Sequence, residues 1–324
     1  MTATGAQHRI SVLRYNEGLR EEWDRFVDES RNGTFLHKRG YMEYHADRFV
    51  DHSLLFYIEE KLVAVLPAHI KGCNLCSHNG LTYGGLLLPQ STTTETVLEI
   101  FDALRAHMLS DTETDTLIYT PTPHIYHAYP CEEDIYALFR NNARLTGCKI
   151  SSAIRLANPL PMKGRRKLTA TMKSRLRIVE DDNFAAFWLV LEERLKEKYG
   201  ISPVHSLEEI ELLHGRFPRN ILLFRVTDNA GATLGGVVIY ITGCVAHTQY
   251  IGTNDEGRRI GVLDYLYEYL INERLKEYEY LDFGTSVEEG GRILNSGLIS
   301  QKERLGGRAV VYNTYEMKIR EGER

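Results

Sequence analysis

The stretch that decides the fold is Ile221-Leu-Leu-Phe-Arg-Val226, followed by Thr227-Asp-Asn-Ala-Gly231 and Thr233-Leu-Gly-Gly-Val-Val-Ile-Tyr-Ile241. Short runs of β-branched and aromatic residues on either side of turn-forming residues predict a β-hairpin. A stretch of the same kind lies earlier, where Ser53-Leu-Leu-Phe-Tyr-Ile58 and Leu62-Val-Ala-Val-Leu-Pro-Ala-His-Ile70 flank a short polar turn. The chain therefore contains two similar hairpins, and a repeat changes the prediction for the whole fold.

The segments that follow the two hairpins also correspond. Each half continues with a third strand, an amphipathic helix, a strand, a short helix and a closing strand. After the third strand these are residues 94–108, 116–120, 132–142 and 149–156 in the first half, and 260–275, 280–283, 291–300 and 308–317 in the second. Corresponding features lie about 165 residues apart, so we expect two tandem domains, residues 1–160 and 161–324, joined near residues 158–167.

Helical segments precede each hairpin, at residues 18–29 in the first half and at 184–199 and 206–215 in the second. Ser206 and Glu209 have the spacing of a capping box, which favours a helix start at that point. The fold class we expect is α/β (α+β), with a mixed, mainly antiparallel sheet flanked by helices in each domain. A doubly wound nucleotide-binding fold and a barrel are excluded, because the strands come first as hairpins and only one crossover follows.

The composition excludes several classes of protein. The formal net charge of −5 argues against binding duplex DNA with the whole surface. The longest apolar runs, such as residues 62–70, are far shorter than a transmembrane segment, and residues 1–7 do not resemble a signal peptide. Five scattered cysteines are expected to be reduced. We therefore expect a cytoplasmic protein without a transmembrane segment, whose oligomeric state the sequence leaves open.

One stretch of the second half carries motifs of a known family. Leu281-Asp-Phe-Gly-Thr-Ser286, Gly291-Arg-Ile-Leu-Asn-Ser-Gly-Leu298 and Gln301-Lys-Glu-Arg-Leu-Gly-Gly307 are similar to Asp-Phe-Gly-x-Ser, Leu-x-x-Phe-Lys and Phe-Gly segments. With the duplicated order of elements, the chain resembles the FemAB-like branch of the GNAT acyltransferase superfamily, whose members carry two GNAT domains in tandem. It departs from the family at Gln301 and Leu305, where an aromatic residue is more frequent.

The resemblance implies that an amine attacks an activated acyl group to form an amide bond. The donor is either an acyl-coenzyme A thioester or an aminoacyl-tRNA, used as a co-substrate rather than a tightly bound cofactor. In coenzyme A-dependent members a Gln/Arg-x-x-Gly-x-Gly/Ala loop holds the pyrophosphate at a helix N-terminus. Here Arg258, Arg259 and Gly261 are candidate donor-binding residues, but Leu263 replaces the small residue, which weakens the prediction of coenzyme A.

Candidate catalytic residues lie in or near the family-like segment. Asp282 could take part in removing a proton from the amine, and Lys302 could neutralise charge near the donor ester or phosphate. Tyr250 is a candidate proton donor to the leaving group. The alternative is that Asp282 caps a turn and that Lys302 lies on the surface.

A block of basic residues follows the junction between the two halves, in a chain that is acidic elsewhere. The block comprises Lys163, Arg165, Arg166, Lys167, Lys173, Arg175 and Arg177. Such residues can bind phosphate, either of a nucleotide-activated sugar or of transfer RNA. The alternative is a solvated surface whose charges pair with the acids at residues 180–182.

The first half offers a candidate acceptor site. His37, Tyr41, His45 and Arg48 crowd one helical segment, where Tyr41, Tyr44, His45 and Arg48 recur every three or four residues. His78 and Tyr83 are predicted on the third strand. Tyrosine rings stack on sugars and imidazoles form directed hydrogen bonds, so these residues suit a sugar or peptide, although such tyrosines are more often partly buried core.

Cys73-x-x-Cys76 with His78 is not accompanied by a second close pair of ligands, so we expect no metal site. The leading prediction is an acyl- or aminoacyltransferase that acts on an amine of a cell-envelope precursor, such as a peptidoglycan intermediate or an amino sugar. The alternatives are an acetyl-CoA-dependent N-acetyltransferase and a non-catalytic protein that binds a glycan or a peptide.

Overall fold

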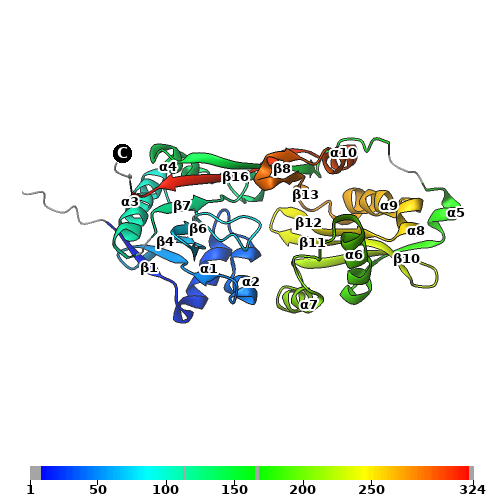
Figure 1. Ribbon diagram of the computed structural model, residues 1–324, viewed down its shortest axis with the longest axis horizontal. Helices are drawn as coiled ribbons and strands as arrows, with labels where there is room; N and C mark the ends of the chain where they lie inside the picture. Colours follow the sequence, from blue (N-terminus) through cyan, green and yellow to red (C-terminus); the bar gives the residue numbers. More distant parts are fainter. Residues whose placement is uncertain (1–8, 112–113, 165–167, 321–324) are drawn as a thin grey trace, which may run out of the picture. The chain divides into compact units, whose positions relative to one another are not determined.

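The computed structural model describes residues 9–111, 114–164 and 168–320 (Figure 1). The chain forms two compact units, which are described separately below. Unit 1 comprises residues 1–149 together with 311–324, and unit 2 comprises residues 150–310. Strands β8 (Arg144–Arg155) and β16 (Arg308–Lys318) contribute residues to both units.

Within the described residues, unit 1 contains a three-stranded sheet, part of a larger sheet and several helices. Strands β1 (Ile10–Arg14), β3 (Leu54–Ile58) and β4 (Lys61–Leu66) form an antiparallel sheet. A second group of strands runs in the order β2-β5-β6-β7-β16. The remaining elements of the unit are α1 (Arg20–Glu29), α2 (Arg39–Met42), β2 (Val50–Asp51), β5 (His69–Lys71), β6 (Asn74–Cys76), α3 (Thr94–Asp111), β7 (Thr116–Tyr119) and α4 (Glu133–Arg140).

Unit 2 is built on one mixed sheet whose strands follow the order β8-β13-β12-β11-β10-β9. All neighbours in it are antiparallel except β12 and β13. The elements are α5 (Ala170–Lys173), β9 (Leu176–Glu180), α6 (Phe184–Tyr199), α7 (Leu207–Arg216), β10 (Ile221–Asp228), β11 (Thr233–Thr242), β12 (Val245–Thr253), α8 (Asp255–Ile260), α9 (Val262–Tyr269), a π-helix (Leu270–Arg274), β13 (Tyr280–Thr285), β14 (Val287–Glu288), β15 (Ile293–Leu294) and α10 (Ser296–Arg304).

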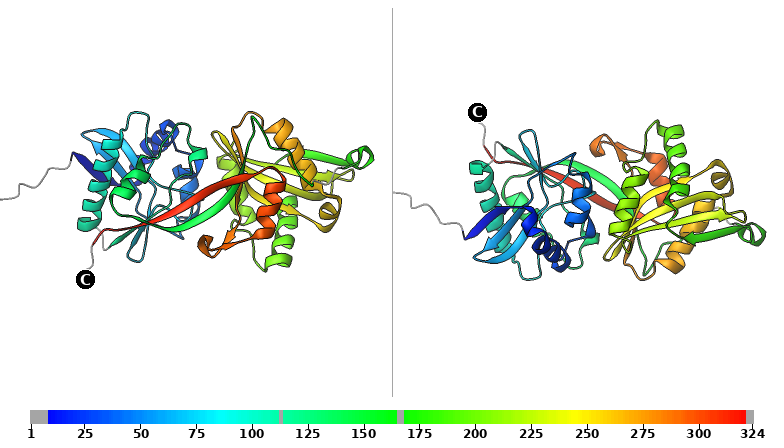
Figure 2. Two further views of the ribbon diagram at one scale, coloured as in Figure 1. Left: turned by 90° about the horizontal axis from the view of Figure 1, so that it is seen from above. Right: turned by 90° about the horizontal axis from the view of Figure 1, so that it is seen from below.

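Each unit contains one pair of parallel strands joined by a helical crossover. In unit 1, β6 pairs with β7 and α3 connects them; in unit 2, β12 pairs with β13 through α8 and α9. Figure 2 shows α3 in cyan and α9 in orange, each lying along the strands of its own unit. The predicted fold class, with a mainly antiparallel sheet flanked by helices and an order of elements that occurs twice, is confirmed.

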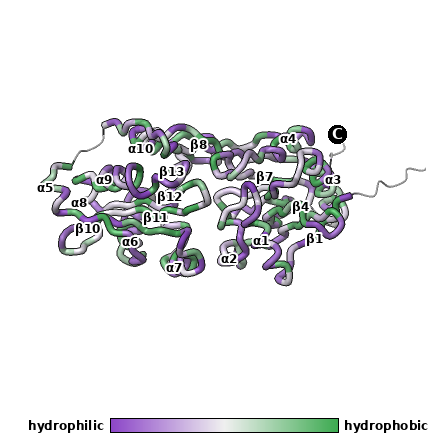
Figure 3. The backbone as a smooth tube through the Cα atoms, turned by 180° about the vertical axis from the view of Figure 1, so that it is seen from behind, coloured by the Kyte–Doolittle hydropathy of each residue, from purple (hydrophilic) through white to green (hydrophobic). Residues whose placement is uncertain are grey.

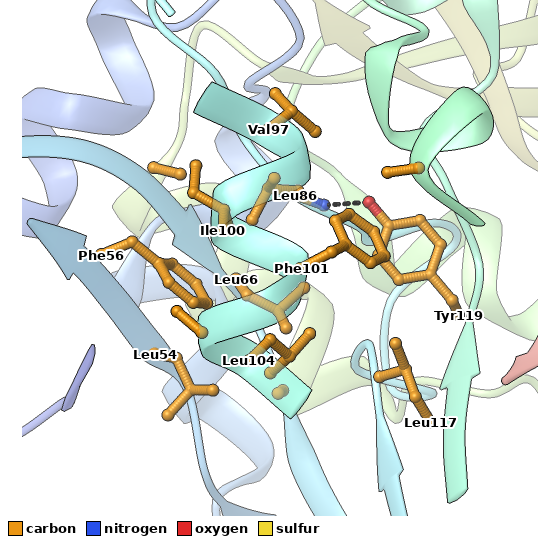
Figure 4. Close-up of a cluster of buried hydrophobic side chains, with 14 of the residues drawn as sticks. Leu54, Phe56, Leu66, Leu86, Val97, Ile100, Phe101, Leu104, Leu117 and Tyr119 are labelled. Atoms are coloured by element: carbon orange, nitrogen blue, oxygen red, sulfur yellow. Dashed lines mark hydrogen bonds between the residues drawn. The ribbon is translucent and has the colours of Figure 1, made fainter. Parts of the chain in front are cut away.

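The core of unit 1 forms between α3 and the strands. Phe101 and Leu104 of α3 pack with Phe56 and Leu66 in a cluster that is almost completely buried (Figure 4). Each such side chain contributes about 1.5–3 kcal/mol by its removal from water. Most residues of β4 are hydrophobic, and the strand is largely green in Figure 3.

Strand β12 contains a β-bulge that decides which way its side chains face. Val238 pairs with Tyr250 but the next residue, Ile239, pairs with Thr248, so Gln249 is the extra residue. A bulge interrupts the alternation of a strand between the two faces of its sheet. Thr248 accordingly contacts Tyr267 of α9, whereas Tyr250 packs on α6.

The structure confirms the helices predicted at residues 184–199 and 206–215. Ser206 accepts a hydrogen bond from the backbone of Glu209, whose carboxylate accepts one from Ser206 N, and α7 begins directly after this capping box. Helix α6 spans the predicted residues 184–199 and ends at Gly200 in a left-handed conformation.

Two local predictions are wrong. No strand reaches residues 83–85, because β6 ends at Cys76, His78 has a left-handed φ of 51°, and Gly84 makes only an isolated bridge to Pro121. The helix expected at residues 291–300 begins at Ser296, since Asn295 caps it and residues 293–294 pair with β14. The division into tandem copies at residue 160 stays a prediction. In the compact units, residues 311–320 belong with the first part of the chain.

Candidate functional site

Polar side chains gather in unit 2 where the two parallel strands stop pairing. The ladder between β12 and β13 ends at the pair His247 and Asp282. Beyond it β12 continues to Thr253, while the end of β13 pairs with β8 through Thr285 and Ser151. Thr248 and Phe283 contact Tyr267 of α9, so the residues before them, His247 and Asp282, face the other side of the sheet.

Asp282 is completely buried and has several polar neighbours. Its Oδ1 accepts hydrogen bonds from Ser151 Oγ and, at 2.9 Å, from Gly284 N. Its Oδ2 lies 3.5 Å from His247 Nδ1. A buried carboxylate needs such partners, because removing a charge from water costs several kcal/mol unless it is paired and hydrogen-bonded. The hydrogen bond from Gly284 N also fits the alternative prediction that Asp282 caps a turn.

Lys302 reaches the same place from α10. Its Nζ donates hydrogen bonds to Gly284 O at 2.8 Å and to Thr285 O at 2.9 Å. Burial lowers the pKa of Lys302 to about 8, and the negative charge of Asp282 opposes the shift. Gly284 has a φ of 74°, which favours glycine, so the turn after Asp282 depends both on this residue and on the buried ammonium.

The structure thus brings the predicted pair Asp282 and Lys302 together around one turn, and Lys302 is buried rather than on the surface. Tyr250 lies on the same strand as His247 and is also buried. The Tyr250 hydroxyl accepts a hydrogen bond of 3.1 Å from His205 N and contacts His205 Nδ1. Its ring meets the Trp188 ring edge to face at 5.1 Å between centroids.

The predicted donor loop is a short helix, α8, that carries acidic residues in its first turn. Asn254 caps it by accepting a hydrogen bond from Gly257 N at 2.8 Å. Arg258 and Arg259 are exposed and pair with Asp255 and Glu256, respectively. Gly261, with a φ of 92°, ends α8 and allows the chain to continue into α9.

A cavity of about 550 Å³ lies beside this loop, between α6, the end of β12 and α8. Four carboxylates and two cations line it. The lining residues are Val190, Glu193, Arg194, Lys196, Glu197, Thr253, Asn254, Asp255 and Glu256. Three of the carboxylates are paired with arginines: Glu197 with Arg194, Asp255 with Arg258 and Glu256 with Arg259.

The basic block is divided between two places: Lys163 N donates a hydrogen bond to Arg304 O of α10, whereas residues 173–177 lie at or near β9, the edge strand. Lys173 ends α5, pairs with Glu268 at 3.5 Å and lies over the Tyr265 ring. Arg175 and Arg177 are exposed, and Arg177 is on β9, the edge strand. Residues 165–167 lie outside the described residues. A phosphate-binding role for the block stays a prediction.

The predicted acceptor residues of unit 1 are mostly core. His37, Tyr41, His45, His78 and Tyr83 are each at most 4% exposed, whereas Arg48 lies over the Tyr44 ring. These aromatic residues come from α2, the short helical turns beside it and the loop at residues 77–85. Their burial corresponds to the alternative that the sequence left open, and a substrate-binding role for them stays a prediction.

His37 and His78 illustrate this environment. His37 Nδ1 accepts a hydrogen bond from Thr34 N at 3.1 Å. The His78 ring packs on those of His45, Phe49 and His69 at 5.2–5.6 Å between centroids. Burial lowers the pKa of both His37 and His78 to about 3. Cys73 is exposed and Cys76 buried, and within the described residues no group of three or more His, Cys, Asp or Glu could hold a metal ion.

Sequence reasoning missed three residues of unit 2: His247, Ser151 and His205. A signal for His247 was present, since it is a histidine within an apolar strand that precedes the crossover to Asp282. Ser151 and His205 carried no comparable signal, because their partners are 131 and 45 residues away.

Residues 162–289 match the model of a protein family described as an acetyltransferase (GNAT) domain. The matched residues all lie within unit 2. The predicted resemblance to the GNAT superfamily is thereby confirmed. No curated protein matches the chain.

Solved structures extend the similarity to the whole chain. FemX superposes with a TM-score of 0.67 at 12% identity, covering 95% of this chain and 97% of FemX. L-PGS from Bacillus licheniformis gives a TM-score of 0.59 at 12% identity, with 91% and 90% of the two chains covered. A tandem GNAT protein from the clavulanic acid biosynthesis pathway gives 0.52 at 12% identity, with 97% and 100% covered. At such identities the similarity shows the fold alone, which this chain shares with FemX, L-PGS and a tandem GNAT protein.

None of the described helices is long and apolar enough to cross a membrane.

Proposed function

We propose that the protein is an acyltransferase that forms an amide bond, by moving an acyl or aminoacyl group to an amine of a cell-envelope precursor in the cytoplasm. The observation that carries this proposal is the polar cluster of Asp282, His247 and Lys302 at the point where β12 and β13 stop pairing. The GNAT family match, which includes both strands up to residue 289, supports it.

The end of the parallel ladder supports acyl transfer for a physical reason. Backbone N–H and C=O groups of β12 beyond His247 are not engaged in the ladder with β13. Such groups are obligatory hydrogen-bonding groups and can hold an extended ligand in the manner of an added strand. A ligand held there would have its acyl carbon next to His247 and Asp282.

The acidic first turn of α8 favours an aminoacyl ester over a coenzyme A thioester as donor. A pyrophosphate needs backbone N–H groups and positive charge at a helix N-terminus. Here Asp255 and Glu256 occupy that turn, their two arginine partners are already paired, and Asn254 takes the N–H of Gly257. The resemblance to FemAB-like proteins supplies aminoacyl-tRNA as the donor class, with Lys173, Arg175 and Arg177 as candidate contacts to the transfer RNA.

The acceptor we propose is a peptidoglycan intermediate or an amino sugar. The support is the FemAB-like resemblance and the fold shared with FemX. An acetyl-CoA-dependent N-acetyltransferase remains the alternative, because the matching family model is that of an acetyltransferase.

The test is a pair of donor experiments on the full chain. Isothermal titration with acetyl-CoA measures thioester binding, and we expect none at millimolar ligand. Bulk transfer RNA charged with radiolabelled amino acids is then incubated with the protein and either a UDP-linked muramoyl pentapeptide or glucosamine. Label transferred to an acceptor through an amide bond would support the proposal. Micromolar binding of acetyl-CoA that is lost in Gly261→Asp would favour the alternative. If acetyl-CoA did not bind and no label were transferred from charged transfer RNA, both would be refuted.

A further inference from the structure

We infer that His247 carries the proton in the transfer reaction and that Asp282 acts through it, as a positioning residue. The inference rests on the proposed function and deepens it, because it assigns the acid–base chemistry of the same site. It changes the role predicted for Asp282 from a direct participant to the group that orients a neighbouring imidazole.

The burial of Asp282 is the first reason. The residue has no exposed surface, and its Oδ1 already accepts hydrogen bonds from Ser151 Oγ and Gly284 N. A carboxylate held in this way cannot approach a substrate amine. Its Oδ2 is directed at His247 Nδ1, 3.5 Å away, and the side chain of His247 is 9% exposed.

The tautomer of the imidazole is the second reason. A carboxylate next to Nδ1 favours the form that carries its proton on Nδ1, which leaves the acid–base chemistry to Nε2. A carboxylate that orients a histidine in this way recurs in enzymes that use the imidazole as a general base. Because His247 is in the last pair of the ladder between β12 and β13, we expect its Nε2 to lie next to the acyl group of a ligand held along β12.

The groups that face His247 are consistent with this role. Tyr240 pairs with it across β11, Asp282 pairs with it across β13, and Lys302 of α10 lies beyond Asp282 on the carbonyls of residues 284 and 285. The buried ammonium balances the buried carboxylate, so the imidazole can gain and lose a proton without leaving Asp282 as the sole buried charge.

The reaction then balances without another reactant. The amine nitrogen attacks the acyl carbon and a C–N bond forms, while a proton moves from that nitrogen to His247 Nε2. The bond from the acyl carbon to the oxygen of the leaving ester breaks, and the imidazolium returns the proton to that oxygen. The products are an amide and a free hydroxyl, and His247 is again neutral.

The first experiment reads the tautomer without measuring activity. Long-range ¹H–¹⁵N spectra of the ¹⁵N-labelled full chain at pH 8 report which ring nitrogen carries the proton, and His247→Gln assigns the signal. We expect the Nδ1–H form, with a shift toward the Nε2–H form in Asp282→Asn. Ser151→Ala, a milder change, should shift it less. An Nε2–H form in the unmodified protein would overturn the inference.

The second experiment uses the transfer assay with charged bulk transfer RNA. General acid–base catalysis contributes about 10²–10⁴-fold, so His247→Ala should lower kcat by at least about 100-fold while KM changes little. Added imidazole should restore part of that rate, which a purely structural role of His247 would not allow. Asp282→Asn should lower kcat less, and imidazole should not restore it.

His214→Gln is the matched control, because His214 Nε2 lies 3.2 Å from Asp182 in the same unit, and α7 packs on β10, which two strands separate from β13. Its kcat should stay unchanged. Transfer that continues at full rate in His247→Ala would refute this inference and leave the proposed function standing. Absence of transfer in the unmodified protein would refute the proposed function, whereas the tautomer would still be measured.

Discussion

Unit 1 should lose stability in mild acid because two of its histidines are buried in the neutral form. His37 and His78 are at most 3% exposed, and burial lowers the pKa of each to about 3. In the unfolded chain a histidine has a pKa of about 6.5. Below pH 6.5 the unfolded state therefore binds protons that the folded state does not, so stability is full above pH 6.5 and falls as the pH drops toward 3.

The magnitude follows from the difference between the two pKa values. At pH 5 an unfolded histidine gains about 2 kcal/mol from protonation, so the two residues together cost unit 1 about 4 kcal/mol relative to pH 7.5. A small domain has a total stability of about 5–15 kcal/mol. The loss is therefore large enough to shift a denaturation midpoint clearly.

The chain offers a simple assay, because it has two tryptophans, one in each unit. Trp188→Phe leaves Trp23 as the reporter of unit 1, where it is buried and donates a hydrogen bond to His37 O. Guanidinium unfolding of this variant is followed by fluorescence at pH 7.5 and pH 5. Adding His78→Asn, which tolerates the left-handed backbone of this position, should reduce the pH dependence by about 2 kcal/mol.

The reasoning would be refuted if the unfolding free energy of unit 1 were the same at both pH values within 1 kcal/mol, or if His78→Asn left the pH dependence unchanged. Retention of the native signal at pH 7.5 in each variant is the control for folding.

Three further outcomes are expected. Lys302→Met should destabilise unit 2 by about 1–3 kcal/mol, because two buried carbonyls lose their charged donor. Guanidinium unfolding of a variant with Trp188 as its only tryptophan measures this, and an unchanged midpoint would contradict the role assigned to the ammonium. The double variant Asp255→Asn and Glu256→Gln should bind acetyl-CoA more tightly than the unmodified chain in titration calorimetry, since it removes two carboxylates and releases two arginines. Equal or weaker binding would show that these two acids do not disfavour the binding of the thioester. Gly257→Ala should lower the melting temperature, because a Cβ there would lie 2.1 Å from a backbone carbonyl oxygen of β11. Gly215→Ala in α7 has open space around the new Cβ and should stabilise the protein by about 0.5–1 kcal/mol. If both substitutions changed the melting temperature in the same direction, the packing argument would be refuted.

Much of the fold could be predicted from the sequence because its signals are local. The capping box at Ser206, the apolar stripe of α6 and the hairpin at residues 221–241 each specify their own element. The predicted third strand failed at residues 83–85 for an equally local reason. His78 adopts a left-handed conformation after β6, which is uncommon for any residue other than glycine and which no motif in the sequence indicated.

The site could be predicted only in part, because its contacts join distant segments. Asp282 and Lys302 were found through family-like motifs, and the structure places both at one turn. His247 and Ser151 depend on which strands become neighbours of β13, which requires the full sheet order. The spacing of the aromatic residues around His37 did not predict that they are buried, because an amphipathic pattern does not indicate how much of the rest of the unit packs over that face.

The last strand of the chain has a consequence for synthesis. Residues 315–318 of β16 pair with β7, and Met317 and Ile319 are part of the core around α3. The ribosome makes these residues only after the whole of unit 2, so unit 1 cannot be completed before residues 311–319 have been synthesised. We therefore expect nascent chains stalled before residue 311 to hold unit 1 in an incomplete, protease-sensitive state. The order of synthesis and the order of completion are reversed in this chain.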